Sequence, residues 1–225
     1  MTSMTHQTAW EKPELNTVDA QIIGREDLYN GFFRAEQLKV RHRLFRGGWS
    51  GELSRELFLR NEAVGVLLYD PKQDWVGLVE QFRVGALDNP DGPWCMEVVA
   101  GMVEPGESIE EVARRELQEE SGVAEVQLEY ICQYLPSPGA CNESMHLLCG
   151  LADLTGVGGI HGLDEEQEDI KVHVIPAQAA LDRLYQGRFN NSAVLLSLQW
   201  LALNRSRLRE LGVDTQSFQN RGPAD

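Results

Sequence analysis

Basic residues are scarce in this chain of 225 residues. It has 20 lysines and arginines against 35 aspartates and glutamates, which gives a net charge of −15 and a pI of about 4.7. No segment is rich in Lys or Arg, so the sequence predicts no nucleic-acid partner and no binding to an anionic membrane surface. A chain with this charge would need metal ions or a few local arginines to bind a phosphorylated substrate.

Paired cysteines, clustered histidines and long apolar runs are also missing. The cysteines at positions 95, 132, 141 and 149 form no C-x-x-C pair, so a zinc site is not expected. The five histidines have no clustered spacing, and we assign none of them a catalytic role. The first residues, MTSMTHQTAW, lack the apolar core of a signal peptide, and no run of 18 apolar residues occurs. We therefore expect a cytoplasmic protein with reduced thiols.

The hydrophobic pattern divides the chain into three parts. Residues 1–18 are polar and predict a flexible N-terminal arm. Apolar and polar residues then alternate around Asn30-Gly31, which predicts antiparallel strands in a small N-terminal β-unit, residues 19–59. The composition changes near residue 60, and we expect a larger domain of helices and strands over residues 60–225.

The larger domain shows several strands, an acidic helix and a helical C-terminal part. Two β-rich runs flank the turn at residues 70–73 and predict a hairpin. Strands are also expected at CMEVVAGMV, VQLEYICQYL, MHLLCGLADL and IKVHVI. The segments PAQAALDRLYQG and NNSAVLLSLQWLALNRSRLREL predict two helices after the last strand.

The acidic helix carries six glutamates between Glu107 and Glu120. Ser108 followed by Glu111 predicts a capping box at its start, and Gly122 predicts its end. An apolar stripe at helical spacing predicts the buried face, and it consists of Ile109, Val112, Ala113 and Leu117. Loop, cap and stripe together hold the glutamates in one place.

Three of these glutamates, Glu116, Glu119 and Glu120, project to one side of the helix. Like charges at this spacing cost roughly 0.2–0.5 kcal/mol per pair in an isolated helix. Arg115 is one residue from Glu116, and we do not expect it to share that face. A hard divalent cation would relieve the repulsion, because carboxylate oxygens are its preferred ligands. The alternative is an acidic helix face that water solvates.

Residues 101–123, GMVEPGESIEEVARRELQEESGV, resemble the signature of the Nudix hydrolases. The matching positions are Gly101, Glu107, Arg115, Glu116, Leu117, Glu119, Glu120, Gly122 and Val123. This resemblance implies an α+β fold, an α/β/α sandwich with a mixed sheet, behind the small antiparallel β-unit. It also implies that the loop and helix bind Mg²⁺ or Mn²⁺ and hydrolyse a nucleoside diphosphate linked to another group.

Segments outside the signature are similar to the ADP-ribose pyrophosphatase branch of this superfamily. Pro138 lies sixteen residues after Gly122, an offset that marks this branch. The segments REDLYNGFF, VRHRLFRG, VEQFRVGA, GIHGLDEEQEDIKVHV and SLQWLAL resemble it in the same order. The resemblance implies Mg²⁺-dependent hydrolysis of ADP-ribose to AMP and ribose 5-phosphate.

The resemblance also implies roles for the acidic residues. Two to three metal ions would be bound by Glu116, Glu120, Glu168 and the backbone carbonyl of Ala100, with Glu119 as a further ligand or a supporting residue. Glu166 would be the general base that activates water, and Arg115 belongs to the catalytic set with Glu116 and Glu120. The loop also contains Asp164, Glu165 and Asp169, which leaves the choice of base open, and a solvated acidic loop is the alternative.

Substrate contacts are implied in the same way. Arg55 and Arg83 would hold the phosphates, and Phe32 and Phe33 would stack on adenine from the partner subunit of a homodimer. The ribose end would be lined by Met102, Ser137, Pro138 and Gly139, with Glu143 near the terminal ribose. The alternatives are surface ion pairs for the arginines and strand-core aromatics for the phenylalanines. The chain has Ser54-Arg55 and Ala140-Cys141 where relatives often have Arg-Arg and Gly-Thr.

Two other functions remain open at this point. A Nudix hydrolase for another nucleoside diphosphate sugar would share the metal-binding helix, although the aromatic pair and the Pro138 segment favour ADP-ribose. A sensor that binds ADP-ribose without cleaving it is the second alternative. Such sensors typically lose signature glutamates and carry a DNA-binding domain, whereas this chain keeps the glutamates and shows no basic extension.

Overall fold

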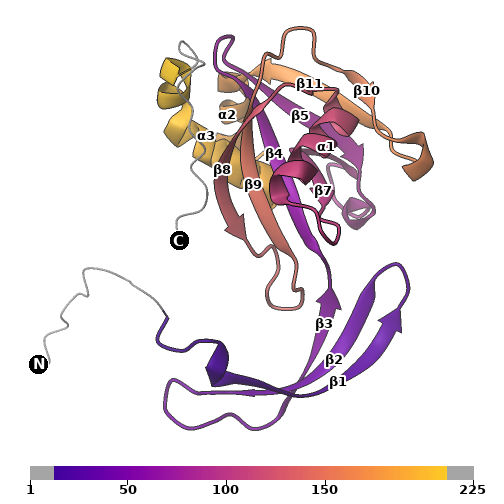
Figure 1. Ribbon diagram of the computed structural model, residues 1–225, viewed down its shortest axis with the longest axis vertical. Helices are drawn as coiled ribbons and strands as arrows, with labels where there is room; N and C mark the ends of the chain where they lie inside the picture. The colour runs from indigo at the N-terminus through magenta and orange to yellow at the C-terminus, as the bar shows by residue number, and fades with distance from the viewer. Residues whose placement is uncertain (1–12, 212–225) are drawn as a thin grey trace, which may run out of the picture. The chain divides into compact units, whose positions relative to one another are not determined.

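The computed structural model describes residues 13–211, which divide into two compact units (Figure 1). Unit 1 comprises residues 13–60 together with Ser137–Asn142, and unit 2 comprises residues 61–136 and 143–211. Unit 1 therefore includes, besides the N-terminal strands, a short loop from the middle of the chain. The predicted arm falls mostly outside the described residues, and its last part leads into a capped 3-10 turn, η1 (Thr17–Asp19).

Unit 1 is a three-stranded antiparallel sheet with little core of its own. Its strands, in the order β1-β2-β3, are β1 (Ala20–Asn30), β2 (Arg34–His42) and β3 (Leu53–Leu59). Only Glu36 and Leu38 are buried among its described residues. The loop at residues 137–142 runs beside β3, where the Phe58 N–H donates to the Ala140 carbonyl at 2.7 Å. The predicted antiparallel strands on both sides of Asn30-Gly31 are confirmed.

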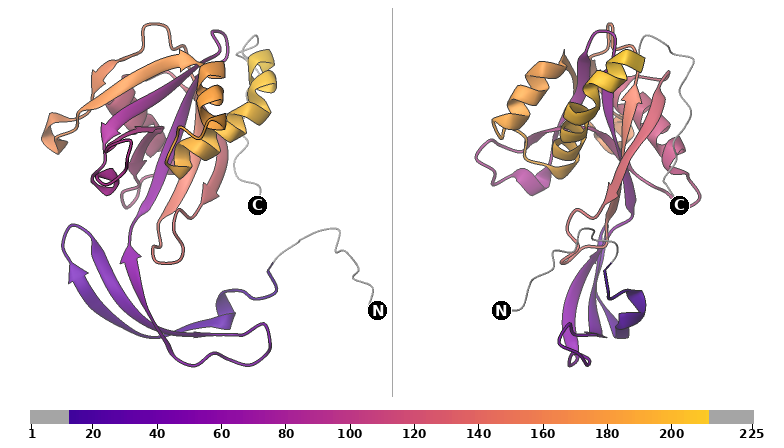
Figure 2. Two further views of the ribbon diagram at one scale, coloured as in Figure 1. Left: turned by 180° about the vertical axis from the view of Figure 1, so that it is seen from behind. Right: turned by 90° about the vertical axis from the view of Figure 1, so that its left-hand side faces the viewer.

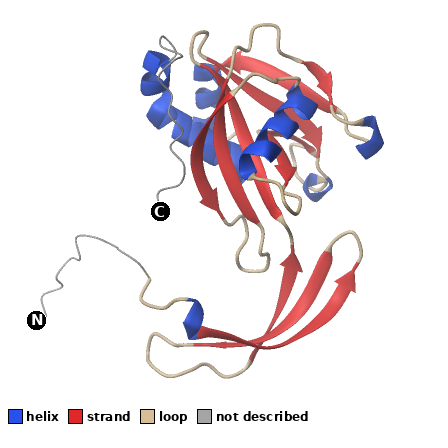
Figure 3. Ribbon diagram, viewed as in Figure 1, coloured by secondary structure: helices blue, strands red, loops and turns tan. Residues whose placement is uncertain are grey.

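Unit 2 is built on one mixed sheet (Figure 3). The main path runs β10-β11-β5-β4-β9-β8, while β6 pairs with β5 and β7 pairs with β4. Strands β4 and β9 are parallel, and the other pairs are antiparallel. The strands are β4 (Glu62–Asp70), β5 (Trp75–Phe82), β6 (Trp94–Glu97), β7 (Val99–Met102), β8 (Gln127–Tyr134), β9 (Ser144–Leu151), β10 (Gly159–His161) and β11 (Ile170–Pro176).

Helices cover both faces of this sheet (Figure 2). Along β4, Val64, Val66 and Leu68 pack under α1 (Ile109–Ser121), whereas Leu67 and Tyr69 face α2 (Ala177–Tyr185) and α3 (Ser192–Leu211). Because β4 is buried on both faces, its sequence is a continuous apolar run instead of an alternating one. The predicted α+β sandwich with a mixed sheet is confirmed.

One predicted strand is divided into two. We expected CMEVVAGMV to form a single strand, but Val98 interrupts it between β6 and β7. The reason lies in the neighbouring hairpin. Strands β4 and β5 pair with each other only next to their turn, at Leu68 to Asp70 of β4, and they separate farther from the turn. Strand β6 pairs with β5, and β7 pairs with the part of β4 that β5 has left. This change of partner carries the chain from Glu97 towards the start of the acidic helix.

The described residues show two further features, which concern the cysteines and the helices. All four cysteines lie within the described residues, and each is a free thiol. Among the helices of residues 13–211, none is both long enough and apolar enough to span a membrane.

Candidate active site

Helix α1 begins and ends at the predicted residues. The Ser108 side chain accepts a hydrogen bond from the Glu111 N–H, and the Glu111 carboxylate accepts one from the Ser108 N–H at 2.8 Å. Gly122 ends the helix with a φ of 70°, a left-handed conformation that glycine adopts without strain. The predicted capping box and C-terminal glycine are therefore confirmed. Both ends of the helix are fixed, so its glutamates keep their positions against the sheet.

Glu120 is the most buried of these glutamates, with 2% of its surface exposed. Its carboxylate accepts a hydrogen bond from the Ala100 N–H in β7 at 3.1 Å. Burial raises the pKa of Glu120 to about 8; the Ala100 N–H opposes this rise, and the negative charges of Glu116 and Glu168 add to it. A carboxyl group in this position is easier to ionise if a cation approaches it.

Glu116 lies one turn earlier and packs against the strand that leads into the signature loop. A Cβ atom at Gly101 would lie 1.7 Å from the Glu116 Oε1, so only glycine allows this approach. Burial raises the pKa of Glu116 to about 7; Arg115 opposes the rise, and Glu119 and Glu168 contribute to it. Gly101 of the signature therefore gives the carboxylate its place beside β7.

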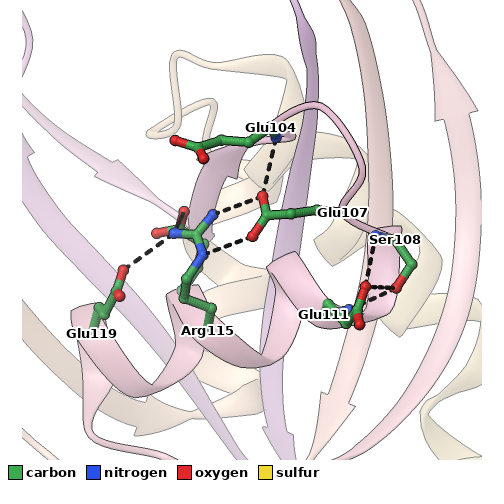
Figure 4. Close-up of polar contacts among 7 residues, drawn as sticks. Glu104, Glu107, Ser108, Glu111, Arg115 and Glu119 are labelled. Carbon is green, nitrogen blue, oxygen red and sulfur yellow. Dashed lines mark hydrogen bonds and ion pairs between the residues drawn. The ribbon is translucent and has the colours of Figure 1, made fainter.

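Arg115 binds three glutamates of the signature (Figure 4). Its Nη1 lies 2.7 Å from the Glu116 Oε1 and 3.3 Å from the Glu119 Oε2, and its Nε lies 3.3 Å from the Glu107 Oε1. The expectation that Arg115 does not share the face of Glu116 is wrong, because its long side chain reaches back across the neighbouring residue. Arg115 therefore offsets part of the repulsion and holds Glu116 in place.

The acidic loop before β11 is attached to the end of α1. The Gly162 N–H donates to the Glu119 carbonyl at 3.3 Å, and a Cβ at Gly162 would lie 2.7 Å from the Cβ of Glu168. The Glu168 carboxylate accepts a hydrogen bond from the Leu163 N–H at 3.2 Å. Between Leu163 and Glu168 the chain forms the 3-10 turn η3 (Asp164–Glu166). Glu166 is exposed there, and its side chain makes no hydrogen bond or ion pair with the rest of residues 13–211.

The donor set near α1 fits a hard divalent cation. The buried Glu120 and the partly buried Glu116 both have raised pKa values, to which the charge of Glu168 contributes, and all three carboxylates offer oxygen ligands. Within residues 13–211, no three His, Cys, Asp or Glu side chains are already arranged as a set of ligands. In this arrangement Arg115 contacts Glu116, the Ala100 N–H contacts Glu120 and the Leu163 N–H contacts Glu168.

Arg83 follows β5 directly and binds Glu97 of β6. Its Nε and Nη2 lie 3.0 Å and 2.7 Å from the same oxygen of Glu97. This pair lines an open pocket of about 430 Å³ together with Gly85, Ala86, Asp88, Asn89, Cys95, Asn190 and Asn191. The charge of Glu120 also acts on Arg83, so the arginine belongs to the neighbourhood of the acidic helix.

The predicted residues of unit 1 lie on its sheet and its turns. Phe32 and Phe33 are in the turn between β1 and β2 and not in a strand, so the strand-core alternative does not hold. Phe32 is 86% exposed, whereas Phe33 packs on Phe58 at 5.1 Å between ring centroids and lies under the Arg60 guanidinium. Arg55 is exposed on β3, where its Nη1 donates to the Ser54 carbonyl.

The predicted residues of the ribose end are distributed over both units. Ser137, Pro138 and Gly139 belong to the exposed loop of unit 1, in which the Ser137 carbonyl accepts a hydrogen bond from the Cys141 N–H at 2.9 Å. Met102 ends β7 in unit 2 and is exposed. Glu143 also belongs to unit 2, just before β9, and is partly buried.

Comparison with known proteins identifies the family. The model of the NUDIX domain family matches residues 59–195. The chain belongs to this family. ADP-ribose pyrophosphatases of Escherichia coli K12 and Haemophilus influenzae are each 44% identical to this Nudix chain, over 85% of it and over 91% and 90% of their own lengths. A GDP-mannose pyrophosphatase of Cronobacter sakazakii is 33% identical over 66% of the Nudix chain and 78% of its own length.

A solved structure supports the Nudix fold independently. The crystal structure of an ADP compounds hydrolase superposes with a TM-score of 0.60 and covers 83% of this chain and 96% of its own, at 21% identity. This likeness confirms the predicted sandwich fold. The family match and the relatives of 44% identity confirm the predictions of a Nudix family member and of a hydrolase.

One residue of this Nudix site escaped the sequence analysis. Glu97, which binds Arg83, lies in the segment CMEVVAGMV, which we predicted as a strand without assigning Glu97 a role. A signal was present, since a glutamate between Met96 and Val98 in a mostly apolar run needs a partner when it is buried. No spacing rule connects it to Arg83, because the two residues are fourteen positions apart and meet only when β6 pairs with β5.

Proposed function

We propose that this Nudix hydrolase cleaves the diphosphate bond of ADP-ribose and releases AMP and ribose 5-phosphate. The proposal is carried by the 44% identity to ADP-ribose pyrophosphatases across about nine tenths of their length. With 191 of the 225 residues matched to the Escherichia coli protein, at most 34 residues lie outside the match, so it extends into the first 59 residues as well as over the signature helix. The more distant GDP-mannose pyrophosphatase supplies the second candidate substrate class.

In this proposal Glu116 and Glu120 bind two to three Mg²⁺ or Mn²⁺ ions together with Glu168 and the Ala100 carbonyl. A divalent cation held by these residues would neutralise the diphosphate and would make an attacking water more acidic. Support comes from the burial of Glu116 and Glu120 beside another carboxylate, because such groups gain from a cation that replaces their missing solvation. Glu119 would assist through Arg115, which already connects it to Glu116.

The remaining residues would bind the substrate and move the proton. Arg83 and Arg55 would hold the phosphates, since their planar guanidinium groups suit phosphate oxygens. Glu166 would take the proton from water, and its free, exposed carboxylate is suited to this role. Phe32 and Phe33 would stack on adenine, while Met102 and Glu143 would face the ribose end with Ser137, Pro138 and Gly139. Positioning and charge stabilisation then account for most of the rate.

We also propose a homodimer that forms through the N-terminal β-unit and shares its active sites between subunits. The turn η1 and the strand β1 of unit 1 expose several large apolar side chains, namely Val18, Ile22, Ile23, Leu28 and Tyr29. A three-stranded sheet with so little core needs a covering surface, and a second copy of the chain is the occupant that we propose.

Replacing Ile22 by aspartate is therefore expected to convert a dimer into a monomer at micromolar concentration. The new carboxylate would be buried without a partner at the interface. Sedimentation equilibrium measures the mass directly, and the wild-type protein should have about twice the chain mass of 25.3 kDa. Leu203→Asp is the control, because Leu203 is 87% exposed on α3 of unit 2. A monomeric wild-type protein would rule out the dimer.

We further place the protein in the cytoplasm, where its four free thiols would remain reduced. Cell fractionation that found it in an oxidising compartment would contradict this assignment.

Product analysis with purified protein tests the proposed reaction. With Mg²⁺, ADP-ribose should yield AMP and ribose 5-phosphate faster than ADP-glucose or GDP-mannose is cleaved, and EDTA should stop all cleavage. EDTA acts here because the diphosphate and the buried carboxylates repel each other without a cation. Faster cleavage of GDP-mannose would replace the substrate and keep the metal site. Binding of ADP-ribose without cleavage would favour a sensor.

A further inference from the structure

The guanidinium group of Arg83 is held from one side. Its Nε–H and one Nη2–H donate to the same oxygen of Glu97, at 3.0 Å and 2.7 Å. A guanidinium group has five N–H bonds in a fixed plane. Within the described residues the other three N–H bonds of Arg83 have no acceptor, so they remain available to a ligand. The side chain is 45% exposed and lines the pocket described above, so it is accessible to a ligand.

Glu97 itself is fixed by its surroundings. Its side chain is 15% exposed, and the buried Gln81 donates its Nε2–H to the carboxylate oxygen that also binds Arg83, at 3.3 Å. Strand pairing places Val79 opposite Glu97 and Gln81 opposite Cys95. The backbone of Arg83 is fixed as well, because its N–H donates to the Pro93 carbonyl at 2.8 Å.

The same strand pairing directs this group of residues to the face of α1. Side chains alternate along β5, and Val79 packs in the core beneath α1, so Gln81 and Arg83 follow it on that face. The charge of Glu120 acts on Arg83, which agrees with this placement. A guanidinium group held there would present its open edge to an anion that is bound beside the carboxylates of α1.

We propose that Glu97 is a positioning residue for Arg83 and that Gln81 supports it. This inference rests on the proposed function, because it takes Arg83 to bind the diphosphate. Glu97 touches neither substrate nor metal in this proposal. It sets the plane and the rotamer of Arg83, so that the free N–H bonds meet the phosphate oxygens without a loss of side-chain freedom on binding.

Replacing Glu97 by glutamine is expected to lower kcat/KM for ADP-ribose about 10- to 100-fold, because Arg83 would no longer be held in the geometry that meets the phosphate oxygens. Little change in Tm is expected. Arg83→Ala and the double variant complete a cycle. If Glu97 acts only through Arg83, the double variant should be no slower than Arg83→Ala alone. Glu129→Gln is the matched control, since Glu129 binds Arg207 on the same unit with similar exposure, and it should keep wild-type kcat/KM.

Each outcome has a defined meaning. Unchanged kcat/KM in Glu97→Gln, or losses that add fully in the double variant, would overturn the positioning role. A lowered Tm with a proportional loss of active protein would show a purely structural ion pair and would also overturn it. If Glu97→Gln does not fold, Gln81→Met tests the same contact and should lower kcat/KM several-fold. A wild-type protein that neither binds nor cleaves ADP-ribose would instead refute the proposed function.

Discussion

Replacing Glu120 by glutamine is expected to slow ADP-ribose turnover roughly 1000-fold and, in the absence of metal, to stabilise the protein at pH 8. The rate falls because the variant loses a charged ligand of the proposed metal site, and a bound cation contributes several kcal/mol to such a transition state. Each 1.4 kcal/mol corresponds to about a tenfold change in rate. Turnover at saturating Mg²⁺, together with the Mg²⁺ concentration that gives half of it, measures this loss.

The gain in stability follows from the pKa of Glu120, which burial raises from its ordinary value of 4.5 to about 8. The folded protein therefore holds this proton more tightly than the unfolded chain does. The contribution of Glu120 to stability is present below pH 4.5, falls as the pH rises, and is lost above about 8. Glutamine cannot ionise, so the variant avoids this loss. Thermal unfolding in EDTA between pH 5 and pH 8 should show the wild-type Tm falling relative to that of the variant.

The control for this experiment is Glu110→Gln on the same helix. Glu110 is exposed and pairs with Arg114, away from the buried carboxylates, so its loss should change neither turnover nor the pH dependence of Tm. Mg²⁺ should raise the wild-type Tm at pH 8 and have a much smaller effect on Glu120→Gln. A variant that keeps full turnover, or one that is less stable than wild type at pH 8, would contradict the assignment.

Local sequence rules predicted those parts of the fold that depend on residues close in the chain. Ser108 and Glu111 are three positions apart, and Gly122 directly follows the helix, so side-chain chemistry alone indicates where α1 begins and ends. The hairpin around Asp70 is similar, since the Asp70 side chain accepts hydrogen bonds from the N–H groups of Lys72 and Gln73. The placement of Glu116, Glu119 and Glu120 on one side of α1 follows in the same way from their helical spacing.

Contacts between distant segments were not predictable in this way. The break at Val98 depends on where β4 and β5 separate, which no property of the segment CMEVVAGMV reveals. The ion pair of Arg83 with Glu97 depends on the same strand pairing. Arg115 was misjudged for another reason, because a rule for helix faces describes Cβ directions, whereas an arginine side chain is long enough to bend around to its neighbour.

Replacing Glu166 by glutamine is expected to reduce turnover by about 10²- to 10⁴-fold, the usual contribution of a general base, without changing the protein's stability or its Mg²⁺ affinity. Glutamine keeps the shape of the side chain and removes its ability to accept a proton. Because Glu166 is exposed and makes no hydrogen bond or ion pair through its side chain within residues 13–211, nothing that supports the fold is lost. Single-turnover rates at saturating ADP-ribose and Mg²⁺ measure the chemical step, and Mg²⁺ titration by calorimetry measures the affinity.

The neighbouring acids of the same turn decide whether Glu166 is the base. Glu165→Gln is the matched control, because Glu165 is exposed in the same 3-10 turn and carries the same charge. If Glu165→Gln or Asp164→Asn loses turnover while Glu166→Gln keeps it, the base is a different member of this loop. If all three variants keep wild-type turnover, the base lies outside this 3-10 turn, and Asp169 is then the remaining candidate base of the loop. A loss of turnover only in Glu166→Gln would identify Glu166 as the proton acceptor. Glu168, whose charge acts on Glu116 and Glu120, would then remain as a ligand of the proposed metal site.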